Sequence, residues 1–256
     1  MMTYKAEPDI SHSKGGLIRQ FRGDPNCAAF YAWVLNYLGQ LAAAGHAPPT
    51  PPLVELTNGQ KGNIGEFITF LVARNEKFGA ANYTPSLAGA LIPLQPGTAV
   101  GLDIMVLFLD PVGNTANDRL YIQEVKATGA EELTYAEALV KDYKKLLDDT
   151  QPSTALQSRI SAIKAKLHLE LNWPLAKIQR VEDIAQPDAK HCTRIRLMPT
   201  LVHDLRHGDP AAALNKVIDQ IYLQGWPDGT IEGWSIAITR LNEAMVQMAN
   251  RKSFTP

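Results

Sequence analysis

Two apolar segments separated by a short polar loop constrain the fold of this chain most strongly. GLDIMVLFLD (residues 101–110) is apolar at nearly every position, which is typical of a strand that is buried on both faces and central in a sheet. RLYIQEVKAT (119–128) follows the loop VGNTAND (112–118), which is rich in turn-forming residues. The two segments therefore predict a β-hairpin inside a larger sheet.

The other segments predict helices around this sheet. Apolar residues at helical spacing and helix-ending glycines predict five helices, at 27–45, 63–79, 134–149, 153–171 and 210–225. In the second of these Asn63 is the expected N-cap, and in the third Thr134 and Glu137 form a predicted capping box. Further strands are expected at 193–204 and 233–242, the latter running toward a helix. The predicted class is α/β (α+β), with a mixed central sheet flanked by helices.

The N-terminal quarter of the chain is expected to lie outside the main domain. Residues 1–24 are polar and irregular in pattern, and HAPPTPP (46–52) is too rich in proline for a helix or a central strand. We therefore expect an N-terminal arm and helix with a Pro-rich linker at 1–52, and the main domain at 53–256.

Composition excludes several classes of protein. The net charge of −1 gives no global signature of a nucleic-acid-coating protein, although local charge can still bind a phosphate backbone. The apolar runs are too short to cross a bilayer, and the N-terminus lacks the apolar region of a secretory signal. Cys27 and Cys192 lie far apart without metal-type spacing. A reducing cytoplasm and no membrane partner are therefore expected.

Charged residues at one end of the predicted hairpin suggest a site. Residues two apart on a strand share a face, so Glu124 and Lys126 point to the same side of the sheet. In an antiparallel pair, Asp103 at the start of the first strand lies opposite the end of the second. Two carboxylates and an ammonium then meet in a small volume. Such a set suits Mg²⁺-assisted phosphoryl chemistry, with the lysine near the attacking water.

The pattern of Asp103, twenty intervening residues and then EVK (124–126) resembles the PD-(D/E)xK nuclease superfamily over roughly residues 60–205. The resemblance implies a restriction-endonuclease-like core, in which Asp103, Glu124 and the backbone carbonyl of Val125 bind the metal. Lys126 would be the catalytic lysine. The glutamate that many members place on the preceding helix is matched by Glu66, as an auxiliary acid and further metal ligand. The chain departs from the family at the proline before the aspartate, which is Leu102 here.

The function implied by this resemblance is a Mg²⁺-dependent endonuclease that hydrolyses DNA, with Mn²⁺ able to replace Mg²⁺. No helix-turn-helix or zinc finger is recognisable, so control by a protein partner such as a helicase or regulatory subunit, or by the N-terminal segment, is expected. A second copy of the chain is another candidate partner. By analogy with the superfamily, the setting would be bacterial defence against phage or foreign DNA.

Two other functions stay open at this point. The chain could be a nuclease-fold subunit that binds nucleic acid or a protein partner without robust catalysis, or an unrelated α/β interaction module. Each site residue also has a structural alternative: Glu124 and Lys126 as a salt bridge on an edge strand, Asp103 as the cap of a turn, and Glu66 as the capping-box partner of Asn63. Asp142-Tyr143-Lys144 is an Asp-x-Lys triplet too, but its predicted helix turns the two charges apart.

Overall fold

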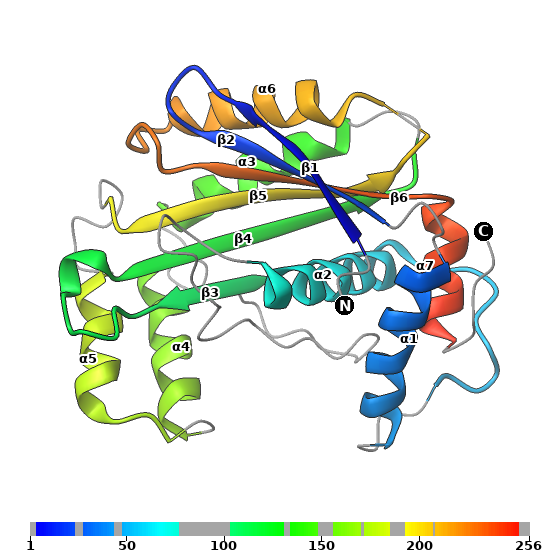
Figure 1. Ribbon diagram of the computed structural model, residues 1–256, viewed down its shortest axis with the longest axis horizontal. Helices are drawn as coiled ribbons and strands as arrows, with labels where there is room; N and C mark the ends of the chain where they lie inside the picture. The colour runs from blue at the N-terminus through cyan, green and yellow to red at the C-terminus, as the bar shows by residue number, and fades with distance from the viewer. Residues whose placement is uncertain are drawn as a thin grey trace.

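The computed structural model describes residues 4–23, 28–43, 48–76, 103–130, 134–147, 156–169, 172–184, 193–206 and 208–250. These ranges form a mixed α/β structure with one six-stranded sheet (Figure 1). The strands are β1 (Tyr4–Ser11), β2 (Leu17–Gly23), β3 (Ile104–Phe108), β4 (Arg119–Thr128), β5 (Ile195–Asp204) and β6 (Glu232–Ile238). The helices are α1 (Ala28–Ala43), α2 (Asn58–Asn75), α3 (Glu137–Leu146), α4 (Leu156–Leu169), α5 (Leu175–Ile184), α6 (Pro210–Tyr222) and α7 (Leu241–Ala249). None of the helices in these ranges is long and apolar enough to cross a membrane.

The sheet has the strand order β1-β2-β6-β5-β4-β3. Its four inner strands β2, β6, β5 and β4 run parallel to one another, and the two edge strands β1 and β3 are antiparallel to the inner strands beside them. The prediction of a mixed sheet flanked by helices is confirmed, and β4 has the predicted bounds. β3 was expected to be central, but it is an edge strand of the described sheet. Its side chains are buried on both faces, so an apolar run indicated burial and not a central position.

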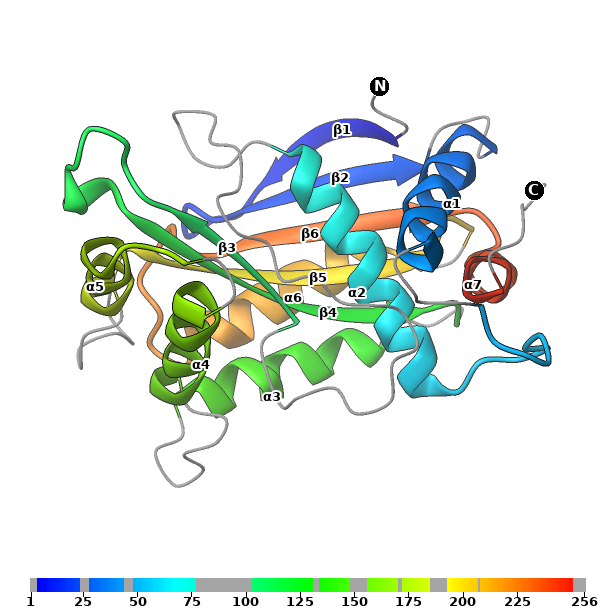
Figure 2. The ribbon, with the colours of Figure 1, turned by 90° about the horizontal axis from the view of Figure 1, so that it is seen from below.

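Helices cover both faces of the sheet. α1, α2 and α7 pack on one face, whereas α3 and α6 pack on the other (Figures 1 and 2). Each face has its own hydrophobic core: the first lies under α1, α2 and α7, and the second lies under α3 and α6. On β4, Tyr121 and Val125 belong to the first core, while Leu120 and Ile122 belong to the second. The alternation predicted for this strand is therefore confirmed. α4 and α5 extend the second core near the turn between β3 and β4 (Figure 2).

The prediction of an irregular N-terminal arm is wrong, because β1 and β2 form a hairpin in the sheet. β1 is a polar edge strand, and of its eight residues only Tyr4 is buried, so its sequence lacks the alternation that marks a strand. β2 joins the sheet through parallel pairing with β6. The sheet and its first core thus extend across the predicted boundary at residue 52.

Two predicted helix starts also differ from the structure. α2 begins five residues before Asn63, and its capping box is formed by Thr57 and Gln60. α3 follows a 3₁₀ helix (Thr134–Ala136), and its N-cap, Ala136, has no side-chain cap. Glu137 instead forms an ion pair with Lys216 of α6, so the expected Thr134–Glu137 capping box is wrong. α2 thus runs helically through its predicted cap, whereas α3 begins three residues after Thr134, which lies in the 3₁₀ helix.

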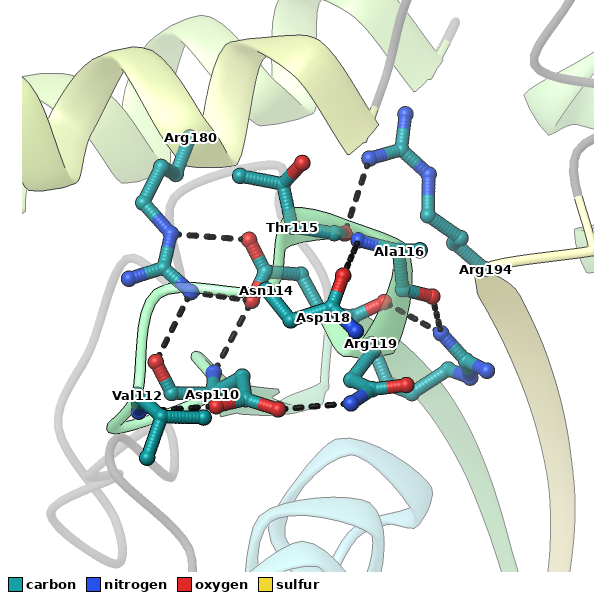
Figure 3. Close-up of polar contacts among 10 residues, drawn as sticks. Asp110, Val112, Asn114, Thr115, Ala116, Asp118, Arg119, Arg180 and Arg194 are labelled. Carbon is teal, nitrogen blue, oxygen red and sulfur yellow. Dashed lines mark hydrogen bonds and ion pairs between the residues drawn. The ribbon is translucent and has the colours of Figure 1, made fainter.

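The turn between β3 and β4 is fixed by buried charge. The side chain of Asp118 is fully buried, accepts two hydrogen bonds from Arg180 of α5, and also accepts one from the backbone N–H of Asp110 (Figure 3). Asp110 in turn accepts a hydrogen bond from Asn117 at 2.6 Å. A buried charge is tolerated only when it is paired and hydrogen-bonded, and here the pairing ties the turn to α5 and fixes the hairpin.

α2 approaches β4 very closely at a glycine. A Cβ atom added at Gly65 would overlap the Cβ of Ala127, whereas one added at Gly62, a turn earlier, would meet nothing within 4 Å. Small residues at this crossing therefore set the distance between the helix and the strand. Glu66 follows directly, so the same contact positions its carboxylate.

We expect Gly65→Ala to destabilise the protein by about 1–3 kcal/mol, because the added methyl group overpacks this crossing. Gly62→Ala is the matched control and should stabilise by about 0.5–1 kcal/mol, since it only removes a glycine from a helix. Urea unfolding measures both. Ala127→Gly in the Gly65→Ala background should restore part of the loss, and equal effects at the two glycines would contradict the close contact.

Candidate active site

The site forms where β3 and β4 stop pairing. The last antiparallel pair at this end is Ile104 with Gln123, but β4 continues to Thr128 alongside β5. Within the described part of the chain, no strand pairs with β4 beyond Gln123 on the β3 side. Asp103 takes that place: its Oδ2 atom accepts a hydrogen bond of 2.7 Å from the backbone N–H of Val125. The first predicted acid is thus held on the strand that carries the other two residues.

Glu124 is buried on β4, with only 4% of its surface exposed. The hydroxyl of Tyr143, on α3, accepts a hydrogen bond from the N–H of Glu124 at 3.2 Å and donates one to the carbonyl of Ile122 at 3.1 Å. Burial, followed by the negative charge of Glu124, raises the pKa of Tyr143 well above its ordinary value. Tyr143 therefore stays protonated and fixes β4 against α3.

Lys126 forms an ion pair with Asp142 of α3, with 2.6 Å between Nζ and Oδ2. Burial alone would lower the pKa of Lys126, but the hydrogen bond to Asp142 and the charges of Asp142, Asp103 and Glu124 outweigh it, and the pKa is raised. Lys126 is thus an ammonium at neutral pH. It can stabilise negative charge or orient a water molecule, but it is a poor proton acceptor.

Asp142 is the residue of this site that the sequence did not reveal. Its triplet with Lys144 was set aside because the two charges diverge on a helix, and the structure instead pairs Asp142 with Lys126 and with Lys145. Burial would raise the pKa of Asp142, but the hydrogen bonds from the two lysines outweigh it and lower the pKa. No spacing in the sequence could indicate this pairing, because it joins a strand to the following helix.

Glu66 completes the group from α2, on the opposite face of the sheet from α3. Burial, followed by the negative charges of Asp103 and Glu124, raises its pKa to about 8, and Lys126 opposes this shift. Glu66, Asp103, Glu124 and Lys126 therefore lie close enough to act on one another electrostatically. The alternative role of Glu66 as a capping residue of Asn63 is wrong, since α2 is capped at Thr57.

The structural alternatives for the other residues also differ from what the structure shows. Glu124 and Lys126 lie where β4 is open on the β3 side, and Lys126 forms an ion pair with Asp142 of α3. Asp103 caps the open edge of β4 through Val125. Val125 belongs to the site through its N–H group, while metal binding by its carbonyl stays a prediction.

The donor set suits a hard divalent cation. Three carboxyl groups lie near one another. The pKa of Glu66 is raised by burial and then by the charges of Asp103 and Glu124, and a cation would relieve this repulsion. Within the described ranges, no three His, Cys, Asp or Glu side chains are arranged to hold a metal ion by themselves. Mg²⁺ commonly takes one or two carboxylates and completes its shell with water and substrate phosphates.

Comparisons with known proteins provide no relative for this site: no family model matches the chain, and no curated protein is detectably similar to it.

The charge of Glu66 should make stability fall as pH rises. Its pKa is 4.5 in the unfolded chain and about 8 in the folded one, so between these values only the unfolded chain has released the proton, and folding is penalised. We expect the free energy of unfolding of Glu66→Gln to exceed that of the unaltered protein by on the order of 1 kcal/mol or more at about pH 9, but not at about pH 5.

Urea unfolding at the two pH values measures this difference, with the exposed Glu55→Gln as the control. Saturating Mg²⁺ should reduce the difference at high pH if the cation binds beside Glu66. The same pH dependence in Glu66→Gln and in the unaltered protein would contradict the electrostatic coupling.

Proposed function

We propose that this chain is a PD-(D/E)xK-like nuclease that uses Mg²⁺ to hydrolyse phosphodiester bonds of DNA. The observation that carries the proposal is the gathering of Glu66, Asp103, Glu124 and Lys126 around the open edge of β4. A second observation supports it. The order α2, hairpin β3–β4, α3 and then β5 parallel to β4 is the order that a restriction-endonuclease-like core has.

Each residue has a role in this proposal. Asp103 and Glu124, with the carbonyl of Val125 and with Glu66, would hold Mg²⁺, which supplies charge neutralisation at the phosphate and a more acidic water. Lys126, kept protonated by Asp142, would stabilise the negative charge that develops on the phosphate oxygens. Glu66, whose raised pKa keeps it largely protonated near neutral pH, would release its proton when it binds the cation.

The biological setting follows the same proposal. A DNA-cutting enzyme without a recognition module needs control, and we propose a partner such as a helicase, a regulatory subunit or a second copy of the chain, in bacterial defence against foreign DNA. A non-catalytic subunit that binds nucleic acid or a protein partner is the second candidate.

Cleavage of supercoiled plasmid with Mg²⁺ or Mn²⁺ tests the proposal. We expect nicking or linearisation that is abolished by EDTA and reduced at least about 100-fold in Glu124→Gln and in Lys126→Met, because each removes a charge that acts on the transition state. Circular dichroism establishes that the variants are folded. Cutting that survives both substitutions would contradict this site, and DNA binding without cutting by the unaltered protein would favour the second candidate.

Asp142 should affect cleavage only through Lys126. We expect Asp142→Asn to lower kcat about tenfold or more with KM nearly unchanged, because Lys126 loses the carboxylate that orients it. Lys145→Gln is the matched control, since Lys145 binds the same carboxylate at 2.8 Å but its side chain is 46% exposed. If both variants had the same small effect, Asp142 would have no positioning role.

A further inference from the structure

A pocket of about 490 Å³ lies directly beside the proposed site. Its walls come from the end of β4 and the residues after it, the first turn of α2, the 3₁₀ helix before α3, and the start of α7. The lining residues are Asn58, Lys61, Ala127, Thr128, Gly129, Ala130, Thr134, Tyr135 and Asn242. Ala127 and Thr128 follow Lys126 on the same strand, and Lys61 precedes Glu66 by about 7.5 Å along α2. The pocket is therefore lined by residues that adjoin the site residues along β4 and along α2.

The charge found in this pocket is opposite in sign to the carboxylates of the neighbouring site. Among the described residues that line the pocket, Lys61 is the one that carries a charge. Its other polar groups are the amides of Asn58 and Asn242 and the hydroxyls of Thr128, Thr134 and Tyr135. These groups suit an uncharged or anionic ligand with many hydrogen-bonding atoms. The site beside it, with its surplus of carboxylates, requires a cation instead.

Two features suit the pocket to a planar ring. The side chain of Tyr135 is available at its rim, since this residue is 49% exposed, and nucleic-acid bases stack on such rings without regard to sequence. On the opposite side, a Cβ atom at Gly129 would overlap the side chain of Asn242. The glycine thus lets the Asn242 amide lie against the backbone, where it can bond to the edge of a base.

We propose that this pocket receives one unpaired nucleotide next to the bond to be cut, so that the substrate is single-stranded DNA or a duplex whose strands have separated locally, as in a negatively supercoiled plasmid. The nucleotide's base stacks on Tyr135, and its phosphate binds Lys61. This inference rests on the proposed nuclease function, and it adds the class of substrate. A base in regular duplex cannot enter a pocket of this kind without leaving its stack.

Binding in EDTA tests the pocket separately from catalysis. The probes are a fluorescein-labelled oligothymidylate and the same strand paired with oligoadenylate, and fluorescence anisotropy gives Kd over a range of salt concentrations. We expect tighter binding of the single strand. Tyr135→Leu should weaken that binding about tenfold through lost stacking, whereas Tyr135→Phe, which keeps the ring, should bind nearly as the unaltered protein does.

The salt dependence identifies the phosphate contact. Lys61→Gln should weaken single-strand binding and reduce the slope of log Kd against log salt by about 0.7, the value for one phosphate contact. The control is Lys5→Gln, on the far edge of the sheet, where the side chain is 61% exposed. It should leave both the affinity and the slope unchanged.

The outcomes separate this inference from the proposed function. Three results would each contradict nucleotide binding in the pocket. These are tighter binding of the duplex, equal losses of affinity for Tyr135→Leu and Tyr135→Phe, and no measurable binding of the single strand. Cleavage of plasmid or oligonucleotide that depends on Glu124 but is unaffected by Tyr135→Leu would support the nuclease function and contradict nucleotide binding in the pocket. Single-strand binding that depends on Tyr135 and Lys61, in a protein that never cuts, would support the pocket and overturn the nuclease.

Discussion

The end of the β3–β4 ladder at Ile104 and Gln123 is the constraint on which the candidate site depends. Beyond this pair the backbone of β4 loses its neighbour on one side, and a buried N–H group that is left without an acceptor is costly. Asp103 meets this need at Val125. The position of the first acid is therefore set by the register of the hairpin. A slip of one residue would turn Glu124 and Lys126 to the opposite face.

The balance of charge around β4 explains why the carboxyl groups affect one another so strongly. Lys126 lies among Glu66, Asp103 and Glu124, but its ammonium group is also bound by Asp142. Since Lys126 is shared in this way, it cannot fully offset the other three acids. Burial is the first cause of the raised pKa of Glu66, and the negative charges of Asp103 and Glu124 add to it. A protein tolerates such a surplus of buried negative charge when a bound cation or a function compensates for it.

The parts of this structure that could be predicted from the sequence are those set by local alternation. The bounds of β4, its two faces and the convergence of Asp103 with Glu124 follow from period-two spacing and antiparallel pairing. β1 could not be predicted, because an exposed edge strand needs no apolar pattern. The pairing of Asp142 with Lys126 could not be predicted either, since it depends on how α3 packs against β4. The true cap of α2, Thr57, was hidden because Asn63 offered an equally good local signal.

α2 connects the stability of the fold to its proposed chemistry. Gly65 sets the distance from α2 to β4, Glu66 faces the carboxylates, and Asn58 and Lys61 line the neighbouring pocket. Because a helix is rigid over this length, the contact of α2 with Ala127 fixes the positions of Glu66 in the site and of Lys61 in the pocket together. A shift of α2 would then move both relative to Lys126, so in the proposed function close packing at this glycine would matter for binding and for catalysis alike. The contact with Ala127 explains why a helix-weakening glycine is present at a buried position, where alanine would otherwise be the more stable residue.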